Sequence, residues 1–549
     1  MNLPGESTTQ IIFSSEARKK LMEGLNKAAD AIGCTLGPRG KTVLIQRQGM
    51  APLVTKDGVT VSKSIKLSDP VARMGADLVR EAASQTNDVA GDGTTTASVL
   101  TQALVKEGMK LVEAGASPLA VCRGINATVD LILEGLRAHA KPVTTDDEIA
   151  QVGTISANGD KTIGRQIADA MAQVGRDGVI TVEDAKGMQT TMEVVEGMQL
   201  DRGYVSPYFV TDPERMRAVY ENATVLITDK KISSFKDIMP ILELVMKVRS
   251  PLLLIAEDFE GDAMTGLVIN RVQNKLPVVC VKAPGYGQHR QDLLADICVL
   301  TGATLISSAT GASLDKFESK YLGSLSKVVS DAKVTTLVGP GKTKDAVKAR
   351  VEEIRTQMAD ISLSQDELTK LRVRAAKLAN GVAVIRVGGA TEIEMQERKF
   401  RIEDALNATK AAAEEGIVPG GGMALFNTVN AVKGQVGKAE GVDPEEVQAA
   451  NAVFRACLGP LHKIVSNSGA TPGVILTELE HKKHELAAGD ELGYNAATGE
   501  YEDLVKAGVI DPVKVTRSAL KHAASVATTF LSLDAVIFDE PSKEHASEQ

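Results

Sequence analysis

Two glycine-rich segments that end in Lys-Thr could place backbone amides and a lysine around phosphate. Residues 35–42 read T-L-G-P-R-G-K-T and residues 336–343 read T-L-V-G-P-G-K-T. A P-loop, G-x-x-x-x-G-K-[ST], needs its first glycine because the backbone must wrap the phosphates directly after a strand. Thr35 and Thr336 occupy the position of that first glycine. In addition, Thr35 follows a segment with a helical pattern, where a P-loop would follow a strand. Neither segment is therefore a P-loop.

A third glycine-rich segment, G-D-G-T-T-T at residues 91–96, has better chemistry for phosphate. Its glycines allow close approach of the backbone, and the helical pattern of residues 97–108 places it at a helix N-terminus. Free amides and the helix dipole favour phosphate there. Asp92 is a natural ligand for the Mg²⁺ that accompanies ATP. Taken alone, a motif of this kind is more often a capped turn, and P-G-G-G at residues 419–422 is most often a flexible turn before a helix.

Two helical segments in the middle of the chain are apolar on more than one face. In residues 235–248 the first stripe is Ile238, Ile241 and Val245, and the second is Met239, Leu242 and Met246. A helix on a sheet buries one stripe, so we expect the second to be exposed or to meet a partner. Residues 264–272 repeat the pattern. A simple core role remains the alternative for both.

The elements that must position these residues fall into two classes. Residues 69–140 and the chain from residue 404 onward are helical in period, whereas short β-rich runs alternate with helix-length segments between them. The runs are 225–227, 252–255, 278–281 and 304–306. This pattern predicts a helical domain that opens and closes the chain, with an α/β domain inserted. Gly197 and Gly381 are candidate pivots of the crossing strands, or ordinary turn glycines.

Composition excludes several classes of protein. A chain of 549 residues predicts about three or four domains. A net charge of −9, 3% aromatic residues and no tryptophan argue against nucleic acid as a partner. No apolar run is long enough to cross a membrane, and residues 1–10 do not resemble a signal peptide. Five scattered cysteines indicate reduced thiols in a cytoplasm.

Seven motifs then identify a family. They are T-L-G-P-R-G at 35–40, T-K-D-G-V-T at 55–60, G-D-G-T-T-T-A at 91–97, E-D-A-L-N-A-T at 403–409, P-G-G-G at 419–422, Y-N-A-A-T-G at 494–499 and D-P at 511–512. In this order they resemble the bacterial and mitochondrial group I chaperonins of the GroEL type. The resemblance runs from about residue 10 to about residue 540 and includes the middle of the chain.

The resemblance implies a multi-domain α+β and α/β fold. A mostly helical equatorial domain would comprise residues 1–138 and 416–549, and a small intermediate domain residues 139–195 and 383–415. An α/β apical domain, residues 196–382, would be inserted in the middle. The implied function is that of an ATP-hydrolysing, cytoplasmic chaperone that binds non-native proteins in a ring cavity and promotes their folding.

The resemblance also implies site residues. The ATP pocket would use Thr35, Leu36, Gly37, Pro38, Lys56, Asp92, Gly93, Thr94, Thr95, Thr96, Gly421, Asn495, Ala496, Ala497 and Asp511. Asp92 would bind Mg²⁺, with K⁺ a further candidate cation. Asp404, assisted by Asp57, would position and activate the attacking water.

A second implied site lies in the apical domain and would bind non-native clients and the loop of a GroES-type co-chaperonin. Its residues would be Tyr204, Tyr208, Phe209, Met239, Leu242, Met264, Val268 and Ile269. Methionine suits a promiscuous surface because its flexible side chain repacks around different partners.

Assembly into seven-membered rings, one or two, is implied, but several features depart from the family. The chain has no C-terminal Gly-Gly-Met repeats, residues 430–493 are longer and divergent, and His462 and Thr471 replace an Arg and a Glu of the contact between rings. A scaffold without useful hydrolysis is the alternative function, and the joint presence of Asp57, Asp92 and Asp404 argues against it. A group II chaperonin would need a helical lid insertion, for which residues 229–290 leave no room.

Overall fold

A computed structural model of the chain describes residues 9–539 except 47–51, 158, 177, 186, 214, 274–275, 308–311, 313, 315–316, 359–364, 437–442 and 483–491. It forms two compact units: a split unit of residues 1–168 and 396–549, and an inserted unit of residues 169–395. The predicted insertion is therefore present. The three-domain boundaries expected from the sequence stay a prediction.

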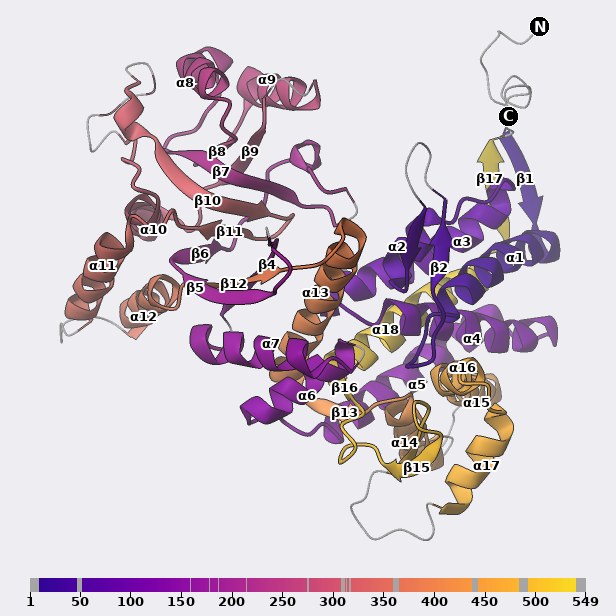
Figure 1. The fold of residues 1–549 in the computed structure, drawn as a ribbon. Coiled ribbons are helices and arrows are strands. Elements are labelled where there is room, and N and C mark those ends of the chain that lie inside the picture. Colours follow the sequence, from indigo (N-terminus) through magenta and orange to yellow (C-terminus); the bar gives the residue numbers. More distant parts are fainter. Residues whose placement is uncertain are drawn as a thin grey trace, which may run out of the picture. The chain divides into compact units, whose positions relative to one another are not determined.

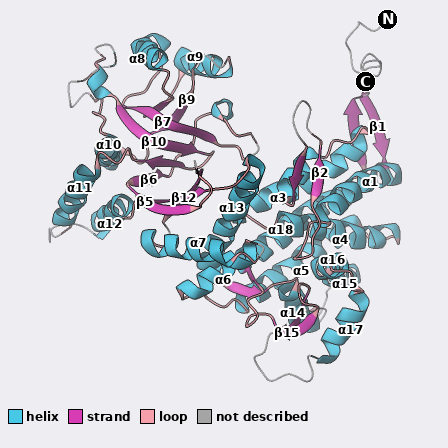
Figure 2. Ribbon diagram, in the orientation of Figure 1, coloured by secondary structure: helices cyan, strands magenta, loops and turns pink. Residues whose placement is uncertain are grey.

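The split unit is mostly helical (Figures 1 and 2). Its helices are α1 (Ser14–Gly33), α2 (Gly58–Ser64), α3 (Pro70–Ala90), α4 (Thr94–Glu113), α5 (Pro118–Ala138), α6 (Asp146–Ser156), α7 (Lys161–Val174), α13 (Glu392–Glu415), α14 (Met423–Val432), α15 (Pro444–Ala456), α16 (Gly459–Asn467), α17 (Pro472–Lys482) and α18 (Val513–Ser532). The ranges of α7 and α13 extend into the inserted unit. Four two-stranded sheets complete the split unit. They pair β1 (Thr9–Phe13) with β17 (Ala535–Asp539), β2 (Val43–Ile45) with β3 (Leu53–Thr55), β13 (Ile417–Pro419) with β16 (Ile510–Pro512), and β14 (Leu492–Asn495) with β15 (Glu500–Asp503).

Helices α1 and α3 approach closely because each places a glycine at the crossing. A Cβ atom on Gly24 would lie 1.7 Å from the Ala72 carbonyl oxygen, and one on Gly75 would lie 1.9 Å from that of Leu21. Only glycine allows this contact. The apolar faces of α1, α3, α4, α5 and α18 then form one core, as the helical period predicts. This core holds the ends of the helices that carry the glycine-rich loops.

The inserted unit contains a six-stranded sheet of order β6-β11-β10-β7-β8-β9. The strands are β6 (Gly197–Leu200), β7 (Ala218–Ile227), β8 (Leu252–Ala256), β9 (Val278–Lys282), β10 (Gly323–Ser330) and β11 (Thr335–Val338), and the helices are α8 (Phe235–Val248), α9 (Gly261–Val272), α10 (Gly287–Thr301), α11 (Lys344–Gln357) and α12 (Gln365–Ala379). Strands β7, β8 and β9 are parallel, with α8 and α9 as their crossovers. The expected strand at residues 304–306 is wrong: this segment makes a single bridge, Thr228 to Ile306.

The inserted unit also contains a three-stranded sheet of β4 (Val179–Asp184), β12 (Val382–Val387) and β5 (Thr191–Val195), with β12 in the middle. Gly381 precedes β12 with φ +65°, and a Cβ there would lie 2.5 Å from the Val195 carbonyl oxygen. A glycine is thus required at this position by conformation and by space. The role of Gly197 and Gly381 as pivots stays a prediction.

Helices α10, α11 and α12 are joined by a buried ionic cluster. Asp296 is fully buried and accepts hydrogen bonds from Arg374 Nε at 2.7 Å, Arg374 Nη2 at 3.0 Å and Arg350 Nε at 2.8 Å. Arg374 is itself buried. The three side chains satisfy one another in an environment where an unpaired charge would be costly.

Two absences hold for the described part of the chain. In residues 229–290, α8, β8, α9 and β9 follow one another through short connections, so there is no helical lid insertion in the described part of that span. No described helix is both long and apolar enough to cross a bilayer.

Candidate functional site

The loop between α3 and α4 has the geometry of a phosphate site. Gly91 (φ +72°) ends α3 and Gly93 (φ +84°) caps α4, so both take the left-handed conformation that glycine adopts without strain. A Cβ on Gly93 would lie 2.6 Å from Cγ1 of Val515. Helix α4 begins at Thr94, so the first-turn amides, which have no partner within the helix, belong to Thr94, Thr95 and Thr96.

Two further loops converge on this helix end. Thr35, just after α1, is buried, and its Oγ1 lies 3.5 Å from Oγ1 of Thr95. At the start of α2, a Cβ on Gly58 would lie 2.6 Å from the same Thr95 hydroxyl. Gly37 has φ +87°, which permits the turn that follows Thr35. The segments at residues 35–37, 57–58 and 91–96 therefore lie together at the N-terminus of α4.

A second group of segments comes from the C-terminal third of the chain, and its Asp511 is close enough to Asp92 to be affected by that carboxylate. Asp511 on β16 pairs with Val418 on β13, and a Cβ on Gly420 would lie 3.2 Å from its Oδ1. Gly421 has φ +66°. Asn495 ends β14, where its Oδ1 accepts from the Ala497 amide at 3.0 Å. Residues 495–497 thus form a turn beside the glycines.

Contacts between residues more than four hundred positions apart link residues 36–39 to the C-terminal third of the chain. Arg39 Nη2 donates to the Ala497 carbonyl oxygen at 3.0 Å, and Asn467 Nδ2 donates to the Leu36 carbonyl oxygen at 2.8 Å. Leu36 packs against the apolar cluster that contains Ala496. The sequence motifs did not single out Arg39 or Asn467, although Arg39 lies within T-L-G-P-R-G.

The site concentrates negative charge. Burial raises the pKa of Asp92, and the carboxylate of Asp57 raises it further, while the Gly93 amide opposes the shift. Burial and the neighbouring Asp92 raise the pKa of Asp511 to about 7. Carboxylates that resist ionising together favour a bound cation. A carboxylate is a ligand that Mg²⁺ prefers, so the chemistry of Asp92 fits this ion. No cluster of three or more His, Cys, Asp or Glu side chains suited to a metal occurs in the described residues.

The Asp511 shift predicts a pH dependence of stability. The unfolded carboxyl has a pKa of 3.8, so the folded protein holds this proton more tightly. The stabilisation is present below about pH 4 and is lost as the pH rises through about 7. In EDTA without nucleotide, Tm should fall from pH 5 to pH 8. The fall should be smaller in Asp511→Asn, which cannot ionise.

A control and a contradicting result complete this test. Glu500→Gln, an exposed change on β15, should keep the wild-type dependence of Tm on pH. An equal fall of Tm in Asp511→Asn and in the wild type would place the titrating group elsewhere.

Helix α13 presents Asp404 toward the glycine-rich loop. Asn407, three residues after Asp404, donates from Nδ2 to the Gly91 carbonyl oxygen at 3.2 Å, and a Cβ on Gly91 would lie 2.6 Å from Cβ of Asn407. One turn further, Ala411 packs against Ala90. Residues three and four apart share one face of a helix, so Asp404 is on the face that meets the loop. Asn407 was part of the E-D-A-L-N-A-T motif, but sequence reasoning gave it no role.

Three of the predicted residues have a further role or an exposed position. Asp57 caps α2: its carboxylate accepts from the Val59 amide at 3.1 Å, the Thr60 amide at 2.9 Å and the Thr60 hydroxyl at 2.6 Å. Lys56 and Pro38 are exposed. The capping contacts give Asp57 a structural role, and its assistance in catalysis stays a prediction.

Comparison with known proteins identifies the family. The profile of the TCP-1/cpn60 chaperonin family matches residues 28–541. The chain belongs to this chaperonin family. Two crystal forms of the chaperonin gp146 from the bacteriophage EL 2 (Pseudomonas aeruginosa), both obtained in the presence of ATP-BeFx, have the same fold. Each is 23% identical in sequence to this chain, and each match covers 96% of this chain and 99% of the phage chaperonin. The TM-scores are 0.65 and 0.61.

The eight residues predicted for client binding, all in the inserted unit, fall into three groups by their exposure to solvent. Tyr208, Met239 and Ile269 are exposed, at 66%, 40% and 48% of their surface. Met264 and Val268 are partly buried against the core, and the buried residues are Tyr204, Phe209 and Leu242. The assignment of these eight residues to client binding stays a prediction. The three exposed side chains are the ones that a client could contact without a rearrangement of the core.

The second apolar stripe of α8 is thus only partly as expected. Met239 and Met246 are exposed, but Leu242 is 4% exposed and belongs to the core beside Ile241 and Val245. Leu242 follows Ile238 by four residues and precedes Val245 by three, so it lies on the buried face of α8. Helices α8 and α9 pack against each other (Figure 1). The exposed apolar surface is consequently narrower than the sequence pattern predicts.

Proposed function

We propose that this chaperonin hydrolyses ATP and uses the energy to bind non-native proteins and promote their folding. The observation that carries the proposal is the contact of Asn407 on α13 with Gly91, which brings the helix of Asp404 to the loop of Asp92. A water-positioning carboxylate and a cation-binding carboxylate are the parts that phosphoryl transfer requires, because the protein mainly orients groups and neutralises charge.

Each part of the pocket has a proposed task. The amides of Thr94, Thr95 and Thr96 would hold the phosphates at the N-terminus of α4, and the turn at residues 495–497 would hold the base. Asp92 would bind Mg²⁺, which supplies charge neutralisation on the phosphate oxygens. Asp404 would orient the attacking water and accept its proton, with Asp57 positioning the start of α2.

The working assembly is proposed to be a seven-membered ring, single or double, in the cytoplasm, with a GroES-type co-chaperonin as a further partner. Five free cysteines, of which Cys457 has its pKa raised to about 12 by burial, suit a reducing compartment. The direct test is Mg²⁺-dependent ATP hydrolysis and ATP-dependent refolding by the purified protein, with electron microscopy of its rings. Hydrolysis without any rise in refolding yield would contradict the coupled function.

The exposed apolar residues of α8 and α9 predict a separation of the two activities. Ile269→Glu puts a charge where an apolar client segment would dock, and burying that charge without a partner is costly. We expect capture of a denatured protein to weaken at least about tenfold, with ATP hydrolysis retained. Suppression of aggregation and steady-state hydrolysis measure the two effects.

Val373→Glu is a matched control because Val373 is 49% exposed, also in the inserted unit, but on α12. It should bind clients like the wild type. Equal loss of capture in both variants would show that added charge, and not the α8–α9 surface, is responsible. Undiminished capture in Ile269→Glu would remove Ile269 from the client site.

A further inference from the structure

The turn at residues 495–497, which is proposed to hold the base, has one polar side chain. Its other two residues are alanines, so side-chain recognition of the base on this turn falls to Asn495. The main-chain carbonyl oxygen of Asn495 accepts from the Gly499 amide at 2.8 Å. That of Ala497 accepts from Arg39 at 3.0 Å. On this turn, the choice between bases therefore depends on how the side-chain amide of Asn495 is oriented.

Both ends of the Asn495 amide have partners of fixed polarity. Its Nδ2 donates to Oε1 of Glu502 at 2.7 Å, and its Oδ1 accepts from the Ala497 amide at 3.0 Å. A carboxylate only accepts and a main-chain N–H only donates, so these partners determine which end of the amide is nitrogen. Asn495 is 9% exposed, and the reversed orientation would bury two mismatched contacts.

The hairpin of β14 and β15 brings Glu502 to this amide. In its register Asn495 is opposite Glu500, two residues before Glu502 on the same strand. Residues two apart on a strand share one face, so Glu502 is a diagonal neighbour of Asn495. The contact between them uses side chains only. Glu502 can therefore be replaced without the loss of a main-chain hydrogen bond of the hairpin.

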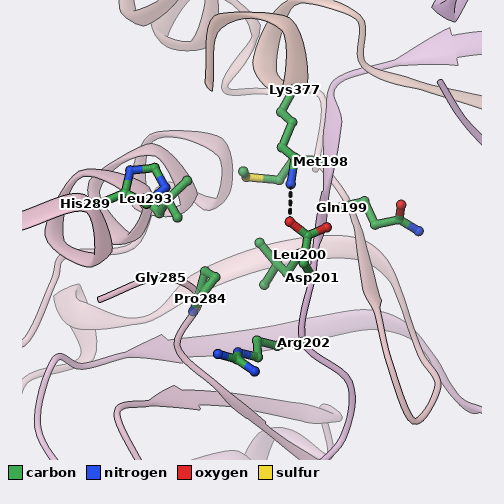
Figure 3. A pocket seen from close by; sticks show the side chains of 10 residues that line it. All are labelled: Met198, Gln199, Leu200, Asp201, Arg202, Pro284, Gly285, His289, Leu293 and Lys377. Atoms are coloured by element: carbon green, nitrogen blue, oxygen red, sulfur yellow. Dashed lines mark hydrogen bonds and ion pairs between the residues drawn. The ribbon is translucent and has the colours of Figure 1, made fainter. Parts of the chain in front are cut away.

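A carboxylate partner has a different effect on an amide than on an ammonium group. Lys377, beside a hollow of about 300 Å³ in the inserted unit, is held by Asp201 at 2.7 Å (Figure 3). The three N–H groups of a lysine are equivalent, so a ligand would still meet a donor there. The amide of Asn495 has two different ends, and fixing one end fixes the other. Glu502 thereby leaves Oδ1 of Asn495, which has a second lone pair, as an acceptor in a fixed position.

We propose that Glu502 makes the nucleotide pocket selective for a 6-aminopurine by holding Oδ1 of Asn495 toward position 6 of the base. The turn at residues 495–497 holds the adenine of ATP in the proposed function, on which this inference rests. Adenine has an amino donor at position 6, whereas guanine and hypoxanthine have a carbonyl oxygen there. The fixed Oδ1 accepts from the amino group and repels the carbonyl oxygen. Without Glu502 the amide can turn over and donate to that oxygen, so Glu502 is a positioning residue.

Binding of ADP and inosine diphosphate (IDP) to the full-length protein tests this role. The two nucleotides differ in the base alone, since IDP carries hypoxanthine. In isothermal titration calorimetry with Mg²⁺, the wild type should bind ADP at least about tenfold more tightly than IDP. A wild type that binds neither nucleotide would contradict the proposed function as well. Equal affinity for the two would overturn the selectivity assigned to Glu502 and leave the proposed function intact.

Variants on β15 then decide whether the carboxylate sets this selectivity. Glu502→Ala should lower the ratio of ADP affinity to IDP affinity to less than about threefold. Glu502→Gln can accept from Asn495 but can also donate to it, so its ratio should be intermediate. The matched control is Glu500→Ala, which removes an exposed carboxylate from the same face of the strand. It should change the ratio less than about twofold.

Two results with these variants would overturn the proposal. The first is a wild-type ratio in Glu502→Ala, even with both nucleotides bound more weakly, because a purely structural role would damage the pocket for either base. The second is an equal fall of the ratio in Glu500→Ala and Glu502→Ala. It would assign the effect to the charge of the hairpin and not to the contact with Asn495.

Discussion

Asp404→Ala should bind ATP nearly as tightly as the wild type and hydrolyse it at least about a hundredfold more slowly, because general-base catalysis typically contributes that much. The expectation rests on the face of α13 that carries Asp404 and Asn407 and meets Gly91. Single-turnover hydrolysis with a separate measurement of ATP affinity distinguishes the chemical step from binding.

The controls for Asp404→Ala use the same helix. Asp404→Asn keeps the shape but cannot accept a proton, and it should be nearly as slow. Glu397→Gln, which removes an ion pair with Arg401 two turns earlier, should leave the rate unchanged. Near-wild-type hydrolysis in Asp404→Ala would place the base elsewhere, with Asp57 the next candidate.

Asp296→Ala should destabilise the inserted unit by about 3–5 kcal/mol, as is usual when one partner of a buried ion pair is removed. Arg374 would remain buried without its carboxylate partner at 2.7 Å, since its other ion pair is with the more exposed Asp292. Urea unfolding followed by hydrogen exchange in α10, α11 and α12 measures the loss where it arises.

The matched control for Asp296→Ala is Glu353→Ala. Glu353 pairs with Arg350 at 3.0 Å, but its side chain is 60% exposed, and exposed pairs contribute only about 0–1 kcal/mol. Equal destabilisation by the two changes would mean that burial of Asp296 does not determine the energy of this cluster.

Local features of the fold were predictable from the sequence because neighbouring residues determine them. The period of residues 235–248 matches α8, and the glycines of residues 91–96 lie at the predicted helix start. Leu242 lies four residues after Ile238 and three before Val245, so its burial follows from the same helical face, and its assignment to a separate exposed stripe was wrong. Residues 304–306 have strand propensity but make only one bridge.

In the candidate site, too, the local motifs were predictable from the sequence and the tertiary contacts were not. The motifs located the glycines and aspartates, but the contacts that assemble them join distant residues, such as Arg39 with Ala497. Asp57 shows the converse: an aspartate before G-V-T is a helix-cap pattern, and α2 uses it as one. The raised pKa of Asp511 also depends on tertiary structure, because Asp92 is far from it in sequence.

The pairing of β1 with β17 has a consequence for the order in which the protein matures on the ribosome. Residues 169–395 form the inserted unit, which is continuous in sequence and can fold while the rest is still being synthesised. The split unit must wait, because β1 pairs with residues 535–539 and the early helices pack on α18. A nascent chain that ends before Asp511 lacks part of the proposed nucleotide pocket. The proposed client-binding surface would therefore emerge before the proposed ATP site that is to control it.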